Sequence, residues 1–125
     1  MRLDPDLIRG ILTAMEETEI DDPRAYIASI SQIEGYSEKM LIYHIRQLIG
    51  AHFIDGELIN SIGGMGTDVF VKGLTWEGHE FVENSRNDTM WNKAKDTVLS
   101  KAGGISVDIL SEVLKRLVSG AVFGI

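Results

Sequence analysis

Four polar side chains recur at helical spacing between residues 37 and 51 and could together contact a macromolecule. Lys39, Tyr43 and Arg46 are separated by four and three residues, and Gln47 follows directly. Such spacings place side chains on one face of a helix. Arginine and glutamine are suitable partners for the base edges of guanine and adenine. The pattern therefore indicates either a DNA-reading face or the ordinary solvated side of a helix.

Two residues of a following hairpin extend this candidate surface. Met65 lies within the loop GGMG, and Lys72 is the only positive charge in the hairpin. The candidate macromolecule-binding face comprises Lys39, Tyr43, Arg46, Gln47, Met65 and Lys72. The carboxylates beside it are Glu34, Glu38, Asp55, Glu57 and Asp68. Because carboxylates repel phosphate, we favour contact with a protein over contact with DNA.

The other reactive side chains form no catalytic pattern. His44, His52 and His79 include no pair at a spacing of four, and there is no HExxH. GGMG is not followed by GK[ST], so it is not a phosphate loop. With no cysteine, thiolate nucleophiles and thiolate metal sites are excluded. We expect no catalytic residue, no metal, no cofactor and no enzymatic activity. We interpret His79, near Trp76, as packing or hydrogen-bonding between the C-terminal helix and the hairpin.

The balance of charge also argues against an ordinary DNA-binding surface. The 125 residues carry a net charge of −7. Residues 1–74 hold 6 basic and 12 acidic side chains, a balance of −6, whereas residues 75–125 hold 6 and 7, a balance of −1. DNA-binding domains neutralise phosphates with lysine and arginine, so this acidity lowers the expectation of DNA binding. No signal-peptide pattern or bilayer-length apolar run is present, and we expect a cytoplasmic protein with no membrane partner.

The elements that must position these side chains begin with a clearly marked helix. In LDPDLIRGILTAMEE, Asp4 suits the N-cap, Pro5 suits the first helical position, and apolar residues follow one face. Pro23 is expected to prevent continuation of this helix. The stretch YIASI, residues 26–30, is rich in β-branched residues and predicts a short strand. Ser37 then suits the cap of the helix that carries the candidate face.

A hairpin and three helical segments complete the chain. FIDGELINSI and TDVFVKGLT flank GGMG and predict two antiparallel strands. Thr75 suits the cap of a helix over WEGHEFVENSRND, with a break at residues 87–89 before MWNKAKDTVLSKA. Trp91 recurs at helical spacing with apolar neighbours and is expected in the core. Ser106 suits the cap of a last amphipathic helix. Its expected inward positions are Ile109, Leu110, Val113, Leu114, Leu117 and Val118.

This order of elements predicts an α+β fold, because helices pack on one small antiparallel sheet. We interpret it as a winged helix-turn-helix with a two-stranded wing and a helical C-terminal extension. Residues 1–74 form the winged-helix core, and residues 75–125 form the extension packed on it within a single compact domain. The last helix and the apolar tail SGAVFGI either close the core or pair two copies as a homodimer.

Several stretches carry a family resemblance. GYSEKMLIYHIRQL, LTWEGHEFVENSRNDTMWNKAK and GGISVDILSEVL resemble an uncharacterised domain-of-unknown-function family of small bacterial and prophage proteins. The resemblance implies a winged-helix-like fold and a phage or mobile-element setting, and it implies no established activity. The chain departs from the expected Ala-Gly-Leu type of turn at residues 51–53. His52 must therefore adopt the left-handed conformation under strain or shift the turn by a residue.

We interpret the protein as a non-enzymatic interaction module whose acidic surface suits a basic host or phage protein. The alternative is a DNA-binding transcriptional regulator that uses helix 37–51 and the hairpin 57–74. An outer helix face of lysine and arginine, with the acids turned away, would favour the regulator.

Overall fold

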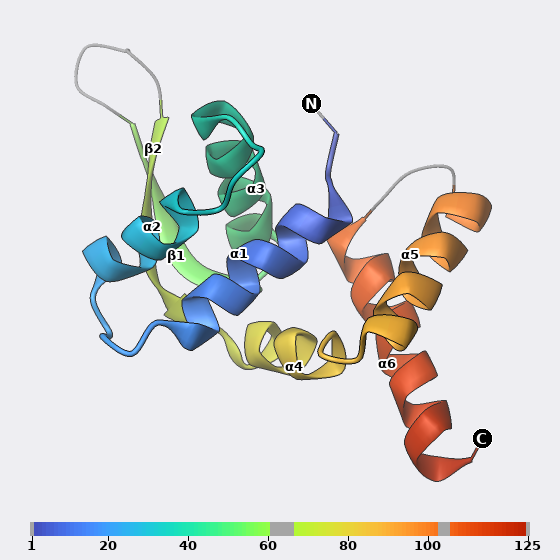
Figure 1. The fold of residues 1–125 in the computed structure, drawn as a ribbon. Helices are drawn as coiled ribbons and strands as arrows, with labels where there is room; N and C mark the ends of the chain where they lie inside the picture. The colour runs from blue at the N-terminus through green and yellow to red at the C-terminus, as the bar shows by residue number, and fades with distance from the viewer. Residues whose placement is uncertain (1, 61–66, 103–105, 125) are drawn as a thin grey trace.

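The described residues form six helices and one antiparallel hairpin, which confirms the α+β class. The computed structural model describes residues 2–60, 67–102 and 106–124. The elements are α1 (Pro5–Glu17), α2 (Pro23–Ser31), α3 (Glu38–Gly50), β1 (Ile54–Asn60), β2 (Thr67–Leu74), α4 (Trp76–Asn84), α5 (Asp88–Ala102) and α6 (Val107–Phe123). Figure 1 shows the hairpin and α2 on one side of α1, and the pair of α5 and α6 on the other.

The predicted helix starts are confirmed at their capping side chains. Asp4 Oδ1 accepts the backbone N–H groups of Asp6 and Leu7 at 2.9 and 3.3 Å. Side-chain caps also begin α3, α4 and α6, and they are Ser37, Thr75 and Ser106. Each cap oxygen satisfies an N–H group that has no acceptor inside the helix, so the cap defines where the helix begins. A break between α4 and α5 is also confirmed, but it lies at residues 85–87 and α5 already begins at Asp88.

The strand predicted at residues 26–30 is wrong. These residues belong to α2, whose N-cap is Asp22 and whose first residue is Pro23. An Asp-Pro pair is a helix-start signal, and it outweighed the β-branched composition of YIASI. Tyr26 and Ile30, four residues apart, are both buried, so packing of one helical face supports the same outcome. The described sheet consequently has only the two strands β1 and β2.

The turn after α3 places His52 in the left-handed region, with a φ of 65°. The N–H of His52 donates to the carbonyl of Ile49 at 3.1 Å, and the N–H of Phe53 donates to the carbonyl of Leu48 at 3.0 Å. These two hydrogen bonds form a Schellman cap, whose left-handed position usually holds glycine. Of the two alternatives open for this turn, His52 thus adopts the strained conformation.

The hairpin is buried at its base and exposed farther out. Ile54 and Val71, close to α3 and α4, are buried. β1 pairs with β2 along its whole length, with an irregularity between Asp55 and Gly56. Figure 1 shows α2 and α3 beside the two strands. The helices α1, α2 and α3 contact β2, and α3 also contacts β1.

The hydrophobic core joins the hairpin base to the helices on both sides. The rings of Phe53, Phe81 and Trp91 meet edge to face, with centroids 5.9 and 5.8 Å apart. They connect the turn after α3 with α4 and α5. Trp91 is 1% exposed, which confirms its predicted place in the core. The buried side chains of α1 are Leu7, Ile8, Ile11, Leu12 and Met15.

The prediction of inward-facing residues in α6 is confirmed at Leu110 and Leu114, which are buried. It is wrong at Ile109, which is 49% exposed. Adjacent helical residues differ by about 100° in direction, so a stripe centred on Leu110 leaves Ile109 outside it. The helix also continues through residues 119–123, where Val122 and Phe123 are exposed. No described helix combines the length and the apolar character needed to cross a membrane.

Candidate interaction surface

The outer side of α3 brings together four of the predicted residues. Lys39, Arg46 and Gln47 are exposed, and Tyr43 is half-buried with its ring edge-on to His44. Lys39 and Arg46 are seven residues apart, so they project from the same side of the helix, two turns from each other. Two cations and one aromatic ring therefore define this face.

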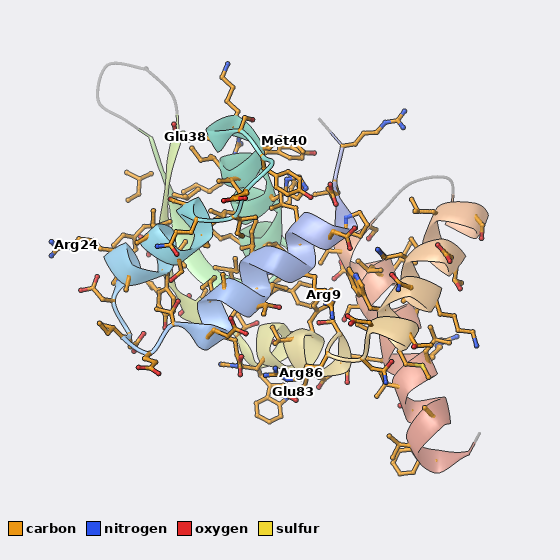
Figure 2. The ribbon with its side chains drawn as sticks, viewed as in Figure 1. Arg9, Arg24, Glu38, Met40, Glu83 and Arg86 are labelled. Atoms are coloured by element: carbon orange, nitrogen blue, oxygen red, sulfur yellow. The ribbon has the colours of Figure 1, made fainter. Side chains whose placement is uncertain are left out.

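The carboxylate of α3 lies on a different side of the helix. Glu38 is the only acidic residue in α3, and it lines a hollow between α2 and α3. It lies at the start of the helix near the hairpin (Figure 2). The outer side of α3 is thus less acidic than the charge balance of residues 1–74 suggests. This is the specific feature that favours the alternative of DNA contact.

A buried histidine fixes α3 against the start of α1. His44 is 0% exposed, and its Nε2 accepts the backbone N–H of Asp4 at 2.8 Å. That nitrogen must be unprotonated, so Nδ1 carries the proton and donates to the carbonyl of Met40 at 2.8 Å. The hydroxyl of Tyr36 donates to Asp4 Oδ2 at 3.0 Å, and burial together with this hydrogen bond raises the pKa of Tyr36. His44 is therefore a structural residue.

The predicted cation of the hairpin is paired. Lys72 Nζ lies 3.1 Å from Glu57 Oε1 on the opposite strand. Such an exposed pair contributes little stability, but it offsets the charge that Lys72 would offer to phosphate. Met65, the remaining predicted position, lies outside the described residues. Because of its pairing with Glu57, Lys72 does not extend the positive charge of the outer side of α3 onto the hairpin.

Exposed apolar side chains occupy the outer part of the hairpin. Leu58, Ile59 and Phe70 are 48%, 46% and 38% exposed. Adjacent strand residues point to opposite faces, so Leu58 and Ile59 expose apolar surface on both faces of the hairpin. The sequence analysis did not identify these residues. The adjacent pair Leu58-Ile59 was a signal of exposed apolar surface, because at most one of two neighbouring strand residues can face the core.

Two adjoining hollows lie beside this apolar surface. One, of about 350 Å³, lies between α2 and α3, and the other, of about 400 Å³, lies between α2 and β2. Both are lined by Ile27 and Val69. The second hollow, here called the α2–β2 groove, is lined by Pro23, Arg24, Ile27, Ala28, Val69, Phe70 and Val71. Arg24, its only charged lining residue, points outward from α2 (Figure 2).

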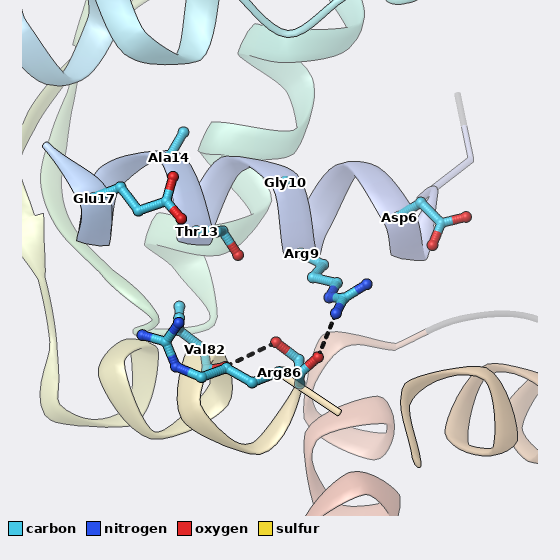
Figure 3. A pocket seen from close by; sticks show the side chains of 9 residues that line it. Asp6, Arg9, Gly10, Thr13, Ala14, Glu17, Val82 and Arg86 are labelled. Carbon is cyan, nitrogen blue, oxygen red and sulfur yellow. Dashed lines mark hydrogen bonds between the residues drawn. The ribbon is translucent and has the colours of Figure 1, made fainter. Parts of the chain in front are cut away.

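A polar groove between α1 and α4 has a structural role. Arg9 Nη2 donates to the carbonyl of Ser85 at 2.6 Å and to Asp88 Oδ1 at 2.8 Å. Its guanidinium lies 5.4 Å from the centre of the Trp91 ring. Figure 3 shows Arg9 reaching from α1 toward the end of α4. These contacts hold the first helix against the junction of α4 and α5.

Arg86 at the same groove is also paired. It contacts Glu16 at 3.0 Å and Glu83 at 3.2 Å, and the hydrogen bond to Glu83 is the main reason why its pKa is raised. Both arginines that line the groove have carboxylate partners, so an anionic ligand would have to compete with those pairs. Within the described residues, no group of three histidine, aspartate or glutamate side chains could hold a metal ion.

The structural role predicted for His79 is wrong. His79 is exposed, and Trp76 is 78% exposed, so neither packs between the C-terminal helix and the hairpin. In LTWEGHEF the junction is made by Thr75 and Gly78 instead. The Thr75 hydroxyl donates to the carbonyl of His52 at 2.7 Å, and its oxygen accepts the N–H of Gly78 at 3.0 Å. The stretch therefore connects the turn after α3 to the start of α4.

The fold and this surface define a small α+β protein with an exposed apolar hairpin beside a helix that carries two cations. Residues 2–105 match the family described as hypothetical protein DUF2513, and the chain belongs to that family. An uncharacterized protein of Haemophilus influenzae is 31% identical over 119 residues, which cover 95% of this chain and 97% of that protein. No solved structure matches the chain. The sequence motif LTWEGHEF indicated a family of unknown function, and the match confirms that the chain belongs to one.

Proposed function

We propose that the chain is a winged helix-turn-helix scaffold that acts as a non-enzymatic interaction module and binds a protein partner. The order of elements supports the scaffold, because α2 and α3 are joined by a short connection and the hairpin follows α3 directly (Figure 1). The helix α2 would be the first helix of the motif, α3 the second, and the hairpin the wing.

The exposed apolar side chains of the hairpin are the observation that carries the choice of a protein partner. A wing that contacts DNA gains affinity from cations facing phosphate, whereas Lys72 is paired with Glu57. Single exposed apolar side chains are common, but a cluster of them marks a site of protein association, and Leu58, Ile59 and Phe70 cluster in the outer part of the hairpin. The proposed partner is a host or phage protein, and this phage or prophage setting rests on the family resemblance alone.

The second candidate is a DNA-binding regulator. It is supported by Lys39 and Arg46 on the outer side of α3, with Glu38 turned toward α2. In that case α3 would occupy a groove of DNA, with Tyr43 and Gln47 near the bases.

Quantitative cross-linking and capture from a lysate of the native host would separate the two candidates. The baits are the unchanged protein, the hairpin variant Leu58→Ser/Phe70→Ser and the helix variant Lys39→Ala/Arg46→Ala. We expect the unchanged protein and the helix variant to retain the same partner in equal amounts, and the hairpin variant to lose it. Thermal melts control for folding, since all four positions are at least partly exposed. Equal capture by the hairpin variant would contradict the proposal.

Fluorescence anisotropy with labelled DNA fragments from the native genome provides the second measurement. We expect no specific binding. A regulator would bind, would lose affinity steeply between about 50 and 200 mM salt, and would lose it again in Lys39→Ala/Arg46→Ala. That result would establish the second candidate in place of the first.

A further inference from the structure

β2 has one open edge, on the side of α2. The described sheet contains only β1 and β2, so β1 covers one edge of β2. Among the described contacts, no backbone group of residues 69–73 pairs with an element other than β1. In an edge strand, alternate N–H and carbonyl groups point away from the neighbouring strand and can pair with another chain. The open edge therefore offers hydrogen bonds of the kind that an extended peptide satisfies.

The α2–β2 groove offers apolar contacts at the same place. Its volume is about 400 Å³, and its walls include Ile27 and Ala28 from α2 and Val69 and Phe70 from β2. Side chains of an added strand alternate between two faces. One set would enter the groove against Ile27 and Val69, and the other would lie beside Phe70 on the outer face. Both faces of such a peptide would thus find apolar surface.

The charge in the groove indicates a further property of the occupant. Arg24 is the only charged side chain that lines it. Asp21 and Asp22 lie nearby but are not among the residues that line the groove; Asp21 accepts the hydroxyl of Tyr26 at 2.8 Å, and Asp22 caps α2 through the N–H of Arg24 at 2.7 Å. An acidic side chain on the peptide would therefore face the Arg24 guanidinium.

We propose that an extended segment of the partner protein adds to the open edge of β2 as a third strand in the α2–β2 groove. Its side chains are apolar at alternate positions, and one carboxylate faces Arg24. This inference rests on the proposed function, because it names the chemistry and the docking mode of the protein partner. Three observations support this proposal: the open edge of β2, the apolar groove along that edge, and the single cation, Arg24, beside the groove.

The test begins with a display library of peptides of about six residues, the usual length of a strand, in which apolar residues alternate with threonine or glutamate. The tightest binder is resynthesised in two forms, each with one alternate set of backbone amides N-methylated. Only one set of amides can face β2 in an added strand. We expect methylation of that set to weaken binding about tenfold or more, and methylation of the other set to leave it unchanged.

Variants of the protein test the location. Ala28→Trp fills the groove, and we expect it to weaken binding about tenfold or more, as loss of a docking pocket would. The matched control is Asn92→Trp, an exposed site on α5, which should bind like the unchanged protein. Arg24→Glu should reverse the preference between peptides that carry glutamate and lysine. Hydrogen exchange of the outward amides in residues 69–71 should slow when the peptide binds.

In the peptide experiments, three results would overturn the inference: no peptide of the library binds, both methylated forms bind equally, or Ala28→Trp binds like the control. The proposed function is judged separately by capture from lysate. If Leu58→Ser/Phe70→Ser loses the partner while Ala28→Trp retains it, the interaction module stands and strand addition is wrong. If the protein alone forms a dimer that Ala28→Trp prevents, a second copy occupies the groove, which also overturns the proposal of a partner segment.

Discussion

At Gly78, the absence of a side chain lets α4 begin directly against the turn that follows α3. A Cβ atom there would lie 2.2 Å from the carbonyl oxygen of Phe53 and 3.2 Å from Leu74 Cδ2. The backbone of Phe53 cannot move away easily, because its carbonyl accepts the N–H of Thr75 at 3.2 Å. The glycine of LTWEGHEF is therefore explained by close approach of two backbones.

Gly78→Ala should reduce the free energy of unfolding by about 2 kcal/mol or more, since the added methyl overpacks against backbone. The matched control is Gly10→Ala in α1, where the new Cβ would lie 3.7 Å from Ile33 Cδ1, an ordinary contact. That control should increase stability by about 0.5 kcal/mol through helix propensity. Urea denaturation of both variants measures the difference. Equal stability of Gly78→Ala and the unchanged protein would refute this account of the junction.

At the scale of elements, one carboxylate links α1 to α5. Asp6 Oδ1 accepts hydrogen bonds from Trp91 Nε1 at 3.0 Å and from Lys95 Nζ at 2.9 Å. Partial burial acts to raise the pKa of Asp6, but the hydrogen bonds from Lys95 and Trp91 outweigh it, so its pKa lies below the ordinary 3.8. The link is therefore strongest when Asp6 is ionised.

This shift has a defined consequence for stability at low pH. Because the pKa of Asp6 is lower in the folded state, its ionisation stabilises the fold above about pH 4, and this contribution is lost as the pH falls through the folded value. Asp6→Asn should lower the free energy of unfolding at pH 7 by about 1 kcal/mol and should flatten its decline below pH 4.

Thermal or urea denaturation across pH 2 to 7, a range that brackets the ordinary pKa of 3.8, measures the effect. Glu19→Gln is the control, since Glu19 is an exposed carboxylate in the α1–α2 connection with no described ion pair. An unchanged pH profile for Asp6→Asn would show that the link contributes nothing.

For the molecule as a whole, the acidic charge is unevenly distributed. Five carboxylates gather at the end of α1 and in its connection to α2, and they are Glu16, Glu17, Glu19, Asp21 and Asp22. The outer side of α3 instead carries Lys39 and Arg46. A negative net charge therefore does not imply a negative α3, and the choice between protein and DNA depends on the hairpin.

The exposed apolar side chains at the end of α6 lead us to expect self-association of the protein. Val122 and Phe123 are 69% and 73% exposed, and Figure 1 shows α6 extending beyond α5. Burying these side chains between two copies would be favourable. Sedimentation velocity should show a concentration-dependent dimer that Val122→Ser/Phe123→Ser weakens. The control Leu99→Ser removes an exposed apolar residue of α5 and should have no effect. A monomer at every concentration would exclude the homodimer through α6.

The amino-acid sequence by itself determined features that depend on neighbours along the chain. Asp4, Ser37, Thr75 and Ser106 start helices because a cap bonds to N–H groups two or three residues away. The outer side of α3 followed from helical period in the same way. The error at residues 26–30 arose where two local signals disagreed, and the Asp-Pro helix start outweighed the β-branched composition.

Only the tertiary structure decided which side chains the finished surface exposes. How much of Leu58 and Phe70 stays exposed depends on which face of the hairpin the helices cover, and neighbours along the chain do not decide that. The pairing of Lys72 with Glu57 depends on the strand register, and the need for Gly78 depends on the path of Phe53. These contacts join residues that are distant in sequence, so they exist only once the chain has folded.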